Sequence, residues 1–286
     1  MKKYIFNLLL LALLFCVTAC SDDDLGPSIF DTTTEELTEL DLWMQKNFVE
    51  PYNIEVIYKW RDVETSMEYN LTPPKEDNAK GLADVLLNIW CKPYVEIGGE
   101  SFFKSLSPKQ LLFIGSSRYT SSGTVTKGTA EGGRKIVIFE GDQYDRTNAT
   151  RLKRYMKTIH HEFAHIAAQT VEYPKEFENI TPNYVEGWDK IKDQDAYDQG
   201  FLSGYAMSEP GEDFAEIVGF MLSNSAEDWE KMLDYPTSQE AKDKLKQKVE
   251  MVVIYYRDTW NVDLYALQAE CEQALYDVVN GVTVNP

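Results

Sequence analysis

The stretch Thr158–Gln169, which reads TIHHEFAHIAAQ, contains all three histidines of the 286-residue chain. His161 and His165 are four residues apart, so on an α-helix both imidazoles project from one face. Glu162 follows the first of them directly. This is the pattern H-E-x-x-H, in which the two histidines hold a zinc ion and the glutamate acts as general base on a water molecule. We therefore expect a metal-binding helix at residues 148–170.

The flanks of the motif have the periodicity of an amphipathic helix. The alternative to a metal site is an ordinary helix of this kind, with its histidines on the surface. On a helix His160 points about 100° away from His161, so we expect it to pack or to support the site rather than to bind metal. The apolar positions that recur at three- and four-residue steps are Leu152, Tyr155, Met156, Ile159, Phe163 and Ile166.

Two histidines do not complete a catalytic zinc site, which usually has three protein ligands. The longer pattern that adds a glycine and a third histidine is absent, because Ala168 and Val171 stand at those positions. With no further histidine in the chain, we expect a carboxylate from the segment Glu212–Glu216. Its two glutamates are four residues apart and share a helix face, so one can bind metal while the other accepts the remaining N–H of a histidine ligand.

The chain begins with the features of a signal peptide at residues 1–19. Lys2 and Lys3 precede the apolar run Leu8–Val17, which is too short to span a membrane as a helix. The run ends in VTAC, which resembles the bacterial lipobox and makes Cys20 the lipidated membrane anchor. The alternative is a plain secretory signal.

Residues 20–33 are expected to form a lipidated tether, and residues 34–286 one domain. The acidic run Asp22–Asp24 resembles the export signal of Bacteroidota surface lipoproteins, which predicts an outer-membrane lipoprotein exposed at the cell surface. A merely solvated charge run is the alternative. The formal net charge of −19 makes nucleic acid an unsuitable partner, because such a surface repels phosphate backbones.

Along the rest of the chain, segments with strand patterns come first and segments with helical patterns follow. This order predicts an α+β domain, with a small mixed sheet followed by a mainly helical C-terminal part. We expect the strand at Ile136–Phe139 to form the cleft edge and to pair with an extended substrate. Strands are expected at 52–60, 111–115 and 135–139, and helices at 79–91, 211–223, 227–233, 238–259 and 264–279.

Cys91 and Cys271 leave one disulfide possible, without establishing it.

The run Gly204–Glu216, GYAMSEPGEDFAE, is similar to the downstream motif of gluzincin metallopeptidases of the anthrax lethal factor type. The resemblance implies that Tyr205 stabilises the transition state, that Glu212 is the third zinc ligand, and that Glu216 supports a histidine ligand. A packing role is the alternative for the tyrosine. The second variable position of H-E-x-x-H holds Ala164, where the toxin type has glycine.

The whole chain after the signal peptide, with the lipobox and the segment Pro51–Trp60, resembles Bacteroidota zinc metallopeptidase lipoproteins encoded beside outer-membrane nutrient importers of the starch-utilisation type. This resemblance implies a zincin-like fold, one Zn²⁺ per chain, a peptide or protein substrate, and association with a nutrient import complex. The competing function is a non-catalytic lipoprotein that captures substrate and uses zinc structurally. Such a site has four protein ligands and does not need Glu162.

Overall fold

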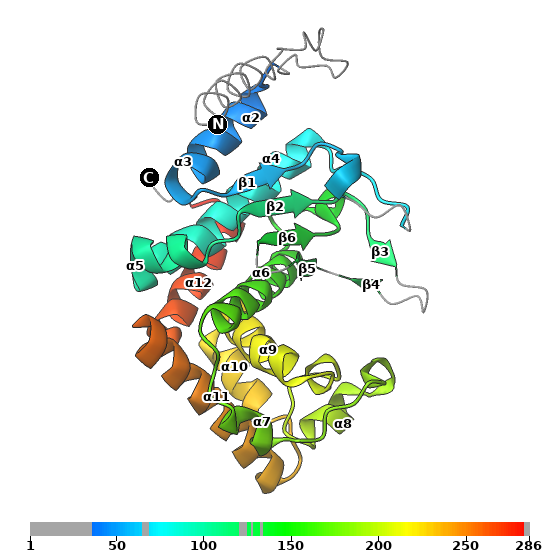
Figure 1. Ribbon diagram of the computed structural model, residues 1–286, viewed down its shortest axis with the longest axis vertical. Helices are drawn as coiled ribbons and strands as arrows, with labels where there is room; N and C mark the ends of the chain where they lie inside the picture. The colour runs from blue at the N-terminus through cyan, green and yellow to red at the C-terminus, as the bar shows by residue number, and fades with distance from the viewer. Residues whose placement is uncertain (1–35, 65–68, 120–124, 127, 132–133, 283–286) are drawn as a thin grey trace, which may run out of the picture. The chain divides into compact units, whose positions relative to one another are not determined.

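The computed structural model describes residues 36–64, 69–119, 125–126, 128–131 and 134–282 (Figure 1). The expected signal peptide, the lipidated Cys20 and the tether lie outside the described residues. From Thr38 onward the described residues belong to one unit. The predicted α+β class, with a small mixed sheet and a mainly helical C-terminal part, is confirmed.

The main sheet has four strands in the order β1-β2-β6-β5. These strands are β1 (Glu55–Ile57), β2 (Gln110–Phe113), β6 (Lys135–Ile138) and β5 (Gly128–Glu131). The first three are parallel, and β5 runs antiparallel to β6 with Gly128 opposite Ile138. Short strands β3 (Arg118–Tyr119) and β4 (Val125–Thr126) form a separate antiparallel pair.

Strand β6 is an interior strand, which corrects the expectation that Ile136–Phe139 forms the edge of the cleft. Its backbone pairs with β2 on one side and with β5 on the other, so it has no free edge for a substrate. The edge on this side is β5, which comes from the Ser, Thr and Gly-rich stretch before β6. That composition is typical of a loop and hid the strand.

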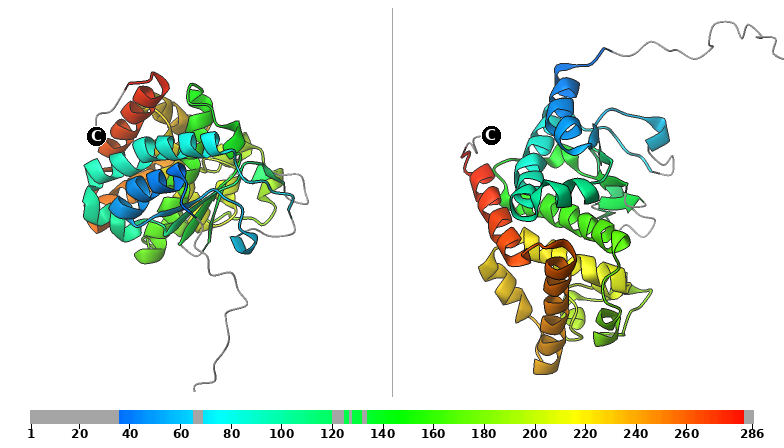
Figure 2. Two further views of the ribbon diagram at one scale, coloured as in Figure 1. Left: turned by 90° about the horizontal axis from the view of Figure 1, so that it is seen from above. Right: turned by 60° about the vertical axis from the view of Figure 1, so that its left-hand side comes forward.

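The sheet is buried on both faces, as the run of apolar residues in each parallel strand requires. Alternate side chains of β2 point to opposite faces: Leu111 and Phe113 join the main core, whereas Leu112 joins a smaller cluster with Ile57 and Val137. Helices cover the main-core face, where α6 runs between the sheet and the C-terminal helices (Figures 1 and 2).

The helices agree with the sequence expectations except in the N-terminal half. The helix expected at 79–91 continues through a π-helical segment into α5, and Gly99, with φ 82° and ψ 158°, then makes a kink within α5. The expected strand at 52–60 shortens to β1, because α3 extends to Tyr52 and Asn53 then turns left-handed. The elements are α2 (Glu39–Met44), η1 (Gln45–Val49), α3 (Glu50–Tyr52), η2 (Asp62–Glu64), α4 (Glu76–Leu86), η3 (Leu87–Cys91), α5 (Lys92–Leu106), η4 (Gly141–Gln143), α6 (Ala149–Thr170), α7 (Glu176–Ile180), η5 (Trp188–Lys190), α8 (Asp193–Tyr197), η6 (Tyr205–Met207), α9 (Pro210–Ser223), α10 (Ala226–Leu233), α11 (Gln239–Trp260) and α12 (Leu264–Val279).

Helices α6 and α9 make the most extensive helix–helix contact of the described chain. Gly219 of α9 lies at this contact. A Cβ built on it would be 3.1 Å from the backbone oxygen of Lys157 and 3.2 Å from Cβ of His161. Glycine therefore lets the two helices approach closely beside the histidine motif.

Cys91 and Cys271 are both buried free thiols, so the disulfide that the sequence left open is not formed. Burial raises the pKa of both thiols, which keeps them protonated and unreactive. Among the described residues, no helix combines the length and the apolar character that crossing a membrane requires.

Candidate metal centre

Helix α6 carries the histidine motif and is fixed at both its start and its core face. Asn148 caps it, accepting a hydrogen bond from the backbone N–H of Arg151 at 3.0 Å. The predicted apolar stripe is buried, from Leu152 to Ile166. Because the stripe fixes the rotation of the helix, His161 and His165 face α9 rather than the core.

His160 lies in the aromatic core, as its position on the helix indicates. Its Nδ1 is 2.9 Å from the hydroxyl of Tyr94, and the two rings stack with centroids 5.5 Å apart. Complete burial lowers the pKa of His160 to about 3, so the imidazole stays neutral. Its contacts are therefore those of a packed residue.

The structure brings together His161, His165 and Glu212 around one point. Nε2 of His161 lies 2.9 Å from Oε2 of Glu212 and 3.1 Å from Nε2 of His165. Nε2 of His165 lies 3.2 Å from the same carboxylate oxygen. Fifty-one residues separate the first histidine from the glutamate, so only the packing of α6 on α9 can make this triangle.

These three atoms fit a zinc ion. Ligands held tetrahedrally at about 2.0–2.1 Å from zinc are about 3.3 Å from one another, and the three observed separations are close to this value. The donor set of two imidazole nitrogens and one carboxylate oxygen is that of many catalytic zinc sites, which keep a fourth position open.

The charges on the triangle also match the needs of a cation. Burial by itself would lower the pKa of His161, but its close contacts with the carboxylates of Glu212 and Glu216 outweigh burial and raise the pKa to about 9. Burial disfavours the charged form of Glu212, yet hydrogen bonds from both histidines hold its pKa well below its usual range. The two carboxylates therefore stay anionic at neutral pH and stabilise positive charge at this point.

Glu216 lies one turn beyond Glu212 on α9 and is only 2% exposed. Its Oε1 is 3.1 Å from Nδ1 of His161, within ion-pair distance but outside the geometry of a straight hydrogen bond. Lys157, one turn before His161 on α6, holds the same carboxylate at 2.9 Å. Burial would raise the pKa of Glu216, but the charges of Lys157 and His161 lower it to about 2. Glu216 thus remains ionised behind the histidine ring.

Tyr205, on η6, faces the same point from the connection between α6 and α9. Its ring centroid is 5.9 Å from that of His161 and 4.8 Å from that of Trp188, with which it makes a T-shaped contact. Burial, then the charge of Glu212 and a hydrogen bond with it, raises the pKa of Tyr205 well above its usual value. The phenol therefore keeps its proton at neutral pH and can donate it in a hydrogen bond.

Glu162 is 8% exposed and follows the first histidine on α6. Its charge contributes to the raised pKa of both His161 and Tyr205. The structure thus brings His161, His165 and Glu212 together around one point, with Glu216 and Tyr205 next to His161 and with Glu162 following His161 on α6.

Sequence reasoning missed Lys157 and the buried ion pair between Asp213 and Lys248. Lys157 had a usable signal, because it is four residues before His161 and shares its helix face. Lys248 had one too, since it interrupts the apolar helical positions Leu245, Val249 and Val252 of α11. Nζ of Lys248 lies 2.7 Å from Oδ2 of Asp213, and both side chains are fully buried. This ion pair attaches helix α9, which carries Glu212, to α11.

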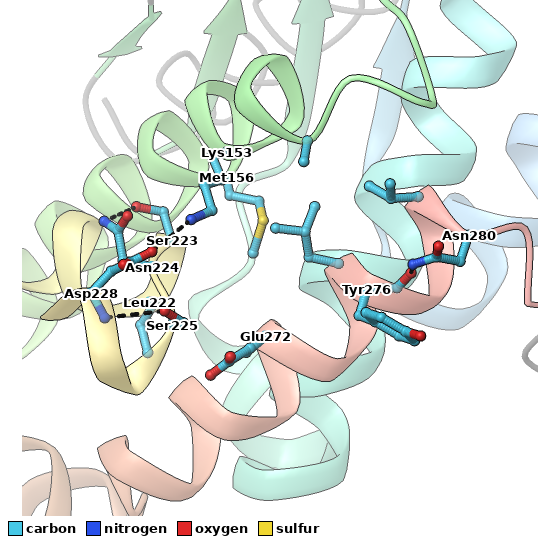
Figure 3. A pocket seen from close by; sticks show the side chains of 13 residues that line it. Lys153, Met156, Leu222, Ser223, Asn224, Ser225, Asp228, Glu272, Tyr276 and Asn280 are labelled. Atoms are coloured by element: carbon cyan, nitrogen blue, oxygen red, sulfur yellow. Dashed lines mark hydrogen bonds and ion pairs between the residues drawn. The ribbon is translucent and has the colours of Figure 1, made fainter.

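A pocket of about 270 Å³, open to solvent, lies away from the metal centre (Figure 3). Residues of α6, α9, α10 and α12 line it, among them Met156, Leu222 and Leu275. At its rim Lys153 pairs with Asp228 at 3.4 Å. None of the histidines or their carboxylate partners reaches it, so this pocket is separate from the chemistry at α6 and α9.

The chain resembles a protein of known structure along most of its length. A crystal structure from Bacteroides caccae, described as that of "a putative zinc-binding metallo-peptidase", is 35% identical in sequence with a TM-score of 0.74. The match covers 88% of this chain and 97% of that one. No curated protein sequence matches the chain.

Residues 33–265 match a family described as "Putative zinc-binding metallo-peptidase". The match includes the histidine motif of α6, the tyrosine of η6, and Glu212 and Glu216 of α9. Because the match spans well over half of the sequence, the chain belongs to this family.

Proposed function

We propose that the protein hydrolyses peptide bonds with one Zn²⁺ held by His161, His165 and Glu212. The observation that carries this proposal is the triangle of their ligand atoms, 2.9–3.2 Å apart, next to a buried glutamate and a protonated tyrosine. When bound, zinc polarises a carbonyl group and lowers the pKa of a coordinated water toward about 7.

The protein's own groups then move the protons. Glu162 takes a proton from the water that attacks the peptide carbonyl, and returns it to the amine nitrogen as the C–N bond breaks. Tyr205 donates a hydrogen bond to the oxyanion of the tetrahedral intermediate, because its raised pKa keeps the phenol protonated. Glu216 holds His161 in the tautomer that leaves Nε2 for the metal.

Metal content and proteolysis of the purified protein test this proposal. We expect about one zinc per chain in the wild type and in Glu162→Gln, and loss of zinc in His161→Ala and Glu212→Ala. Hydrolysis of fluorescein-labelled casein should fall by about 10² or more in Glu162→Gln, since a general base contributes that much. A wild type that binds no zinc, even after reloading, contradicts the proposal.

The same variant distinguishes catalysis from substrate capture. In a capture lipoprotein with structural zinc, Glu162→Gln has no consequence for function. In the proposed peptidase it abolishes turnover while zinc and fold remain. A zinc-loaded wild type without activity on casein or on a broad peptide library would favour capture.

We also propose that the protein is an outer-membrane lipoprotein, anchored at Cys20 and exposed at the cell surface beside a nutrient importer. The lipobox-like VTAC and the acids of Asp22–Asp24 support this location. Labelled palmitate should enter the wild type but not Cys20→Ala, and external protease should degrade the protein on intact cells. Resistance of the protein on intact cells would contradict surface exposure.

A further inference from the structure

Ser203 connects the ligand helix to the turn that carries Tyr205. It lies two residues before the tyrosine and is half-buried. Its Oγ donates a hydrogen bond to Oε2 of Glu216 at 2.6 Å and accepts one from the backbone N–H of Ala206 at 3.0 Å. One hydroxyl thus joins α9 to the first turn of η6.

The carboxylate at the other end of this connection is itself held in place. Glu216 is 2% exposed, and its Oε1 is 2.9 Å from Nζ of Lys157 and 3.1 Å from Nδ1 of His161. Both of these partners lie on α6. Ser203 therefore bonds to a group whose position is already set by the helix that carries the histidines.

The phenol of Tyr205 itself contacts Glu212 of α9. The hydrogen bonds of the turn's backbone and of its second hydroxyl stay within the α6–α9 connection. Oγ of Ser208 donates to the carbonyl of Tyr205 at 2.7 Å, and the N–H of Gly204 donates to Asp193 at 3.3 Å. The carbonyl of Met207 accepts from Val185 at 2.8 Å. These bonds shape the turn but do not set its distance from α9.

We propose that Ser203 is a positioning residue, which uses Glu216 to hold the Tyr205 phenol at the metal centre. A single carboxylate then orients both the histidine ring and the tyrosine turn. This assignment rests on the proposed function of the site, in which Tyr205 stabilises the oxyanion. It adds the group that keeps the tyrosine within reach.

Ser203→Ala removes the connection, and two further variants separate its effect from a general loss of structure. Ser203→Thr keeps the hydroxyl. Ser208→Ala removes an equivalent hydroxyl from the same turn, one that reaches only the local carbonyl of Tyr205. The zinc-loaded proteins are compared for casein hydrolysis, with kcat and KM measured separately, and for zinc affinity by competition with a chelator.

We expect Ser203→Ala to lower kcat by about tenfold or more, in line with the loss of a hydrogen bond to a charged acceptor. KM and zinc affinity should change by less than about threefold, because Glu216 keeps its partners on α6 and an interaction made only in the transition state affects kcat. Ser203→Thr should restore most of the rate, and Ser208→Ala should stay near wild type. A fall in zinc affinity with an unchanged rate per bound zinc would overturn the proposal.

A spectroscopic measurement tests the position of Tyr205 without relying on activity. With 3-fluorotyrosine at position 205, the ¹⁹F resonance of the zinc-loaded protein should be shifted or broadened by Ser203→Ala, and affected much less by Ser203→Thr and Ser208→Ala. An identical spectrum in Ser203→Ala would refute the positioning role. If this resonance moves but no variant cleaves casein, Ser203 positions Tyr205 and the proposed peptidase function fails.

Discussion

At the scale of single residues, His161 meets two carboxylates, one at each ring nitrogen. Glu212 lies 2.9 Å from Nε2 and Glu216 lies 3.1 Å from Nδ1. Without metal, this arrangement stabilises the imidazolium, which accounts for the raised pKa of about 9. A metal at Nε2 replaces the proton there, so metal binding and protonation compete for the same nitrogen.

This competition predicts how the metal-free protein responds to pH. A histidine whose pKa is raised from 6.5 to about 9 by folding contributes stability that is complete below about pH 6.5 and is lost as the pH rises through about 9. We expect the Tm of the chelator-treated protein to fall across this range.

Two controls separate His161 from the general repulsion of an acidic chain at high pH. In His161→Gln the fall in Tm should be smaller, because the titrating imidazole is gone. The zinc-loaded protein should likewise show a flatter profile, since its imidazole is already neutral. Equal slopes in all three samples would contradict the assignment of the raised pKa to His161.

At the scale of elements, the site depends on how closely α6 and α9 pack. Gly219 allows the contact, and a β-branched side chain there would meet the backbone of Lys157 and the Cβ of His161. Separating the helices moves Glu212 and Glu216 away from the histidines together. The ligand triangle is therefore a property of the helix pair.

We expect Gly219→Val to destabilise the protein by about 1–3 kcal/mol, the usual cost of overpacking, and to weaken zinc binding. Urea unfolding and chelator competition measure the two effects. Gly211→Val is the matched control, because a Cβ at Gly211, in the first turn of the same helix, has no neighbour within 4 Å. Similar losses in both variants would show that the effect is one of helix propensity.

The second contact that fixes α9 is the ion pair between Asp213 and Lys248 of α11. Tyr184 also donates to Asp213, at 3.1 Å, and the ammonium lies 4.0 Å from the ring centroid of Phe201. Burial raises the pKa of Asp213, opposed by the charge of Lys248, so the carboxylate depends on this partner.

Lys248→Met should cost about 3–5 kcal/mol of unfolding free energy, because it leaves a buried carboxylate without its cation. The double variant Lys248→Met with Asp213→Leu should recover much of that loss, since no buried charge remains. Urea unfolding of the wild type, the two single variants and the double variant forms a double-mutant cycle, which measures the interaction free energy of the two residues. Additive losses would argue against a direct interaction between the two residues.

At the scale of the whole molecule, the metal centre joins two helices that are far apart in sequence. A ligand that binds the folded state alone stabilises it by mass action. We expect zinc removal to lower the free energy of unfolding by about 4 kcal/mol when free zinc had been about 1,000 times its Kd.

Thermal unfolding with and without chelator measures this difference. The shift in Tm should persist in Glu162→Gln, which keeps every proposed ligand, and should largely vanish in Glu212→Ala. A shift that survives in Glu212→Ala would place the metal elsewhere.

The sequence by itself determined the parts of this protein that depend on local patterns. The helix expected at 148–170 is α6 (Ala149–Thr170), and the four C-terminal helices also lie within a few residues of their expected bounds. Helical hydrogen bonds span four residues, so periodicity and capping groups reveal them. The spacing of His161, Glu162 and His165 belongs to the same local scale.

Only the tertiary structure decided which distant groups meet. It brought Glu212 to Nε2 and Glu216 to Nδ1 of one histidine, made β5 rather than β6 the sheet edge, and buried Lys248 against Asp213. It also placed Ser203 between the tyrosine turn and α9. Strand order and helix contacts join residues many positions apart, and no periodicity in the sequence encodes their partners.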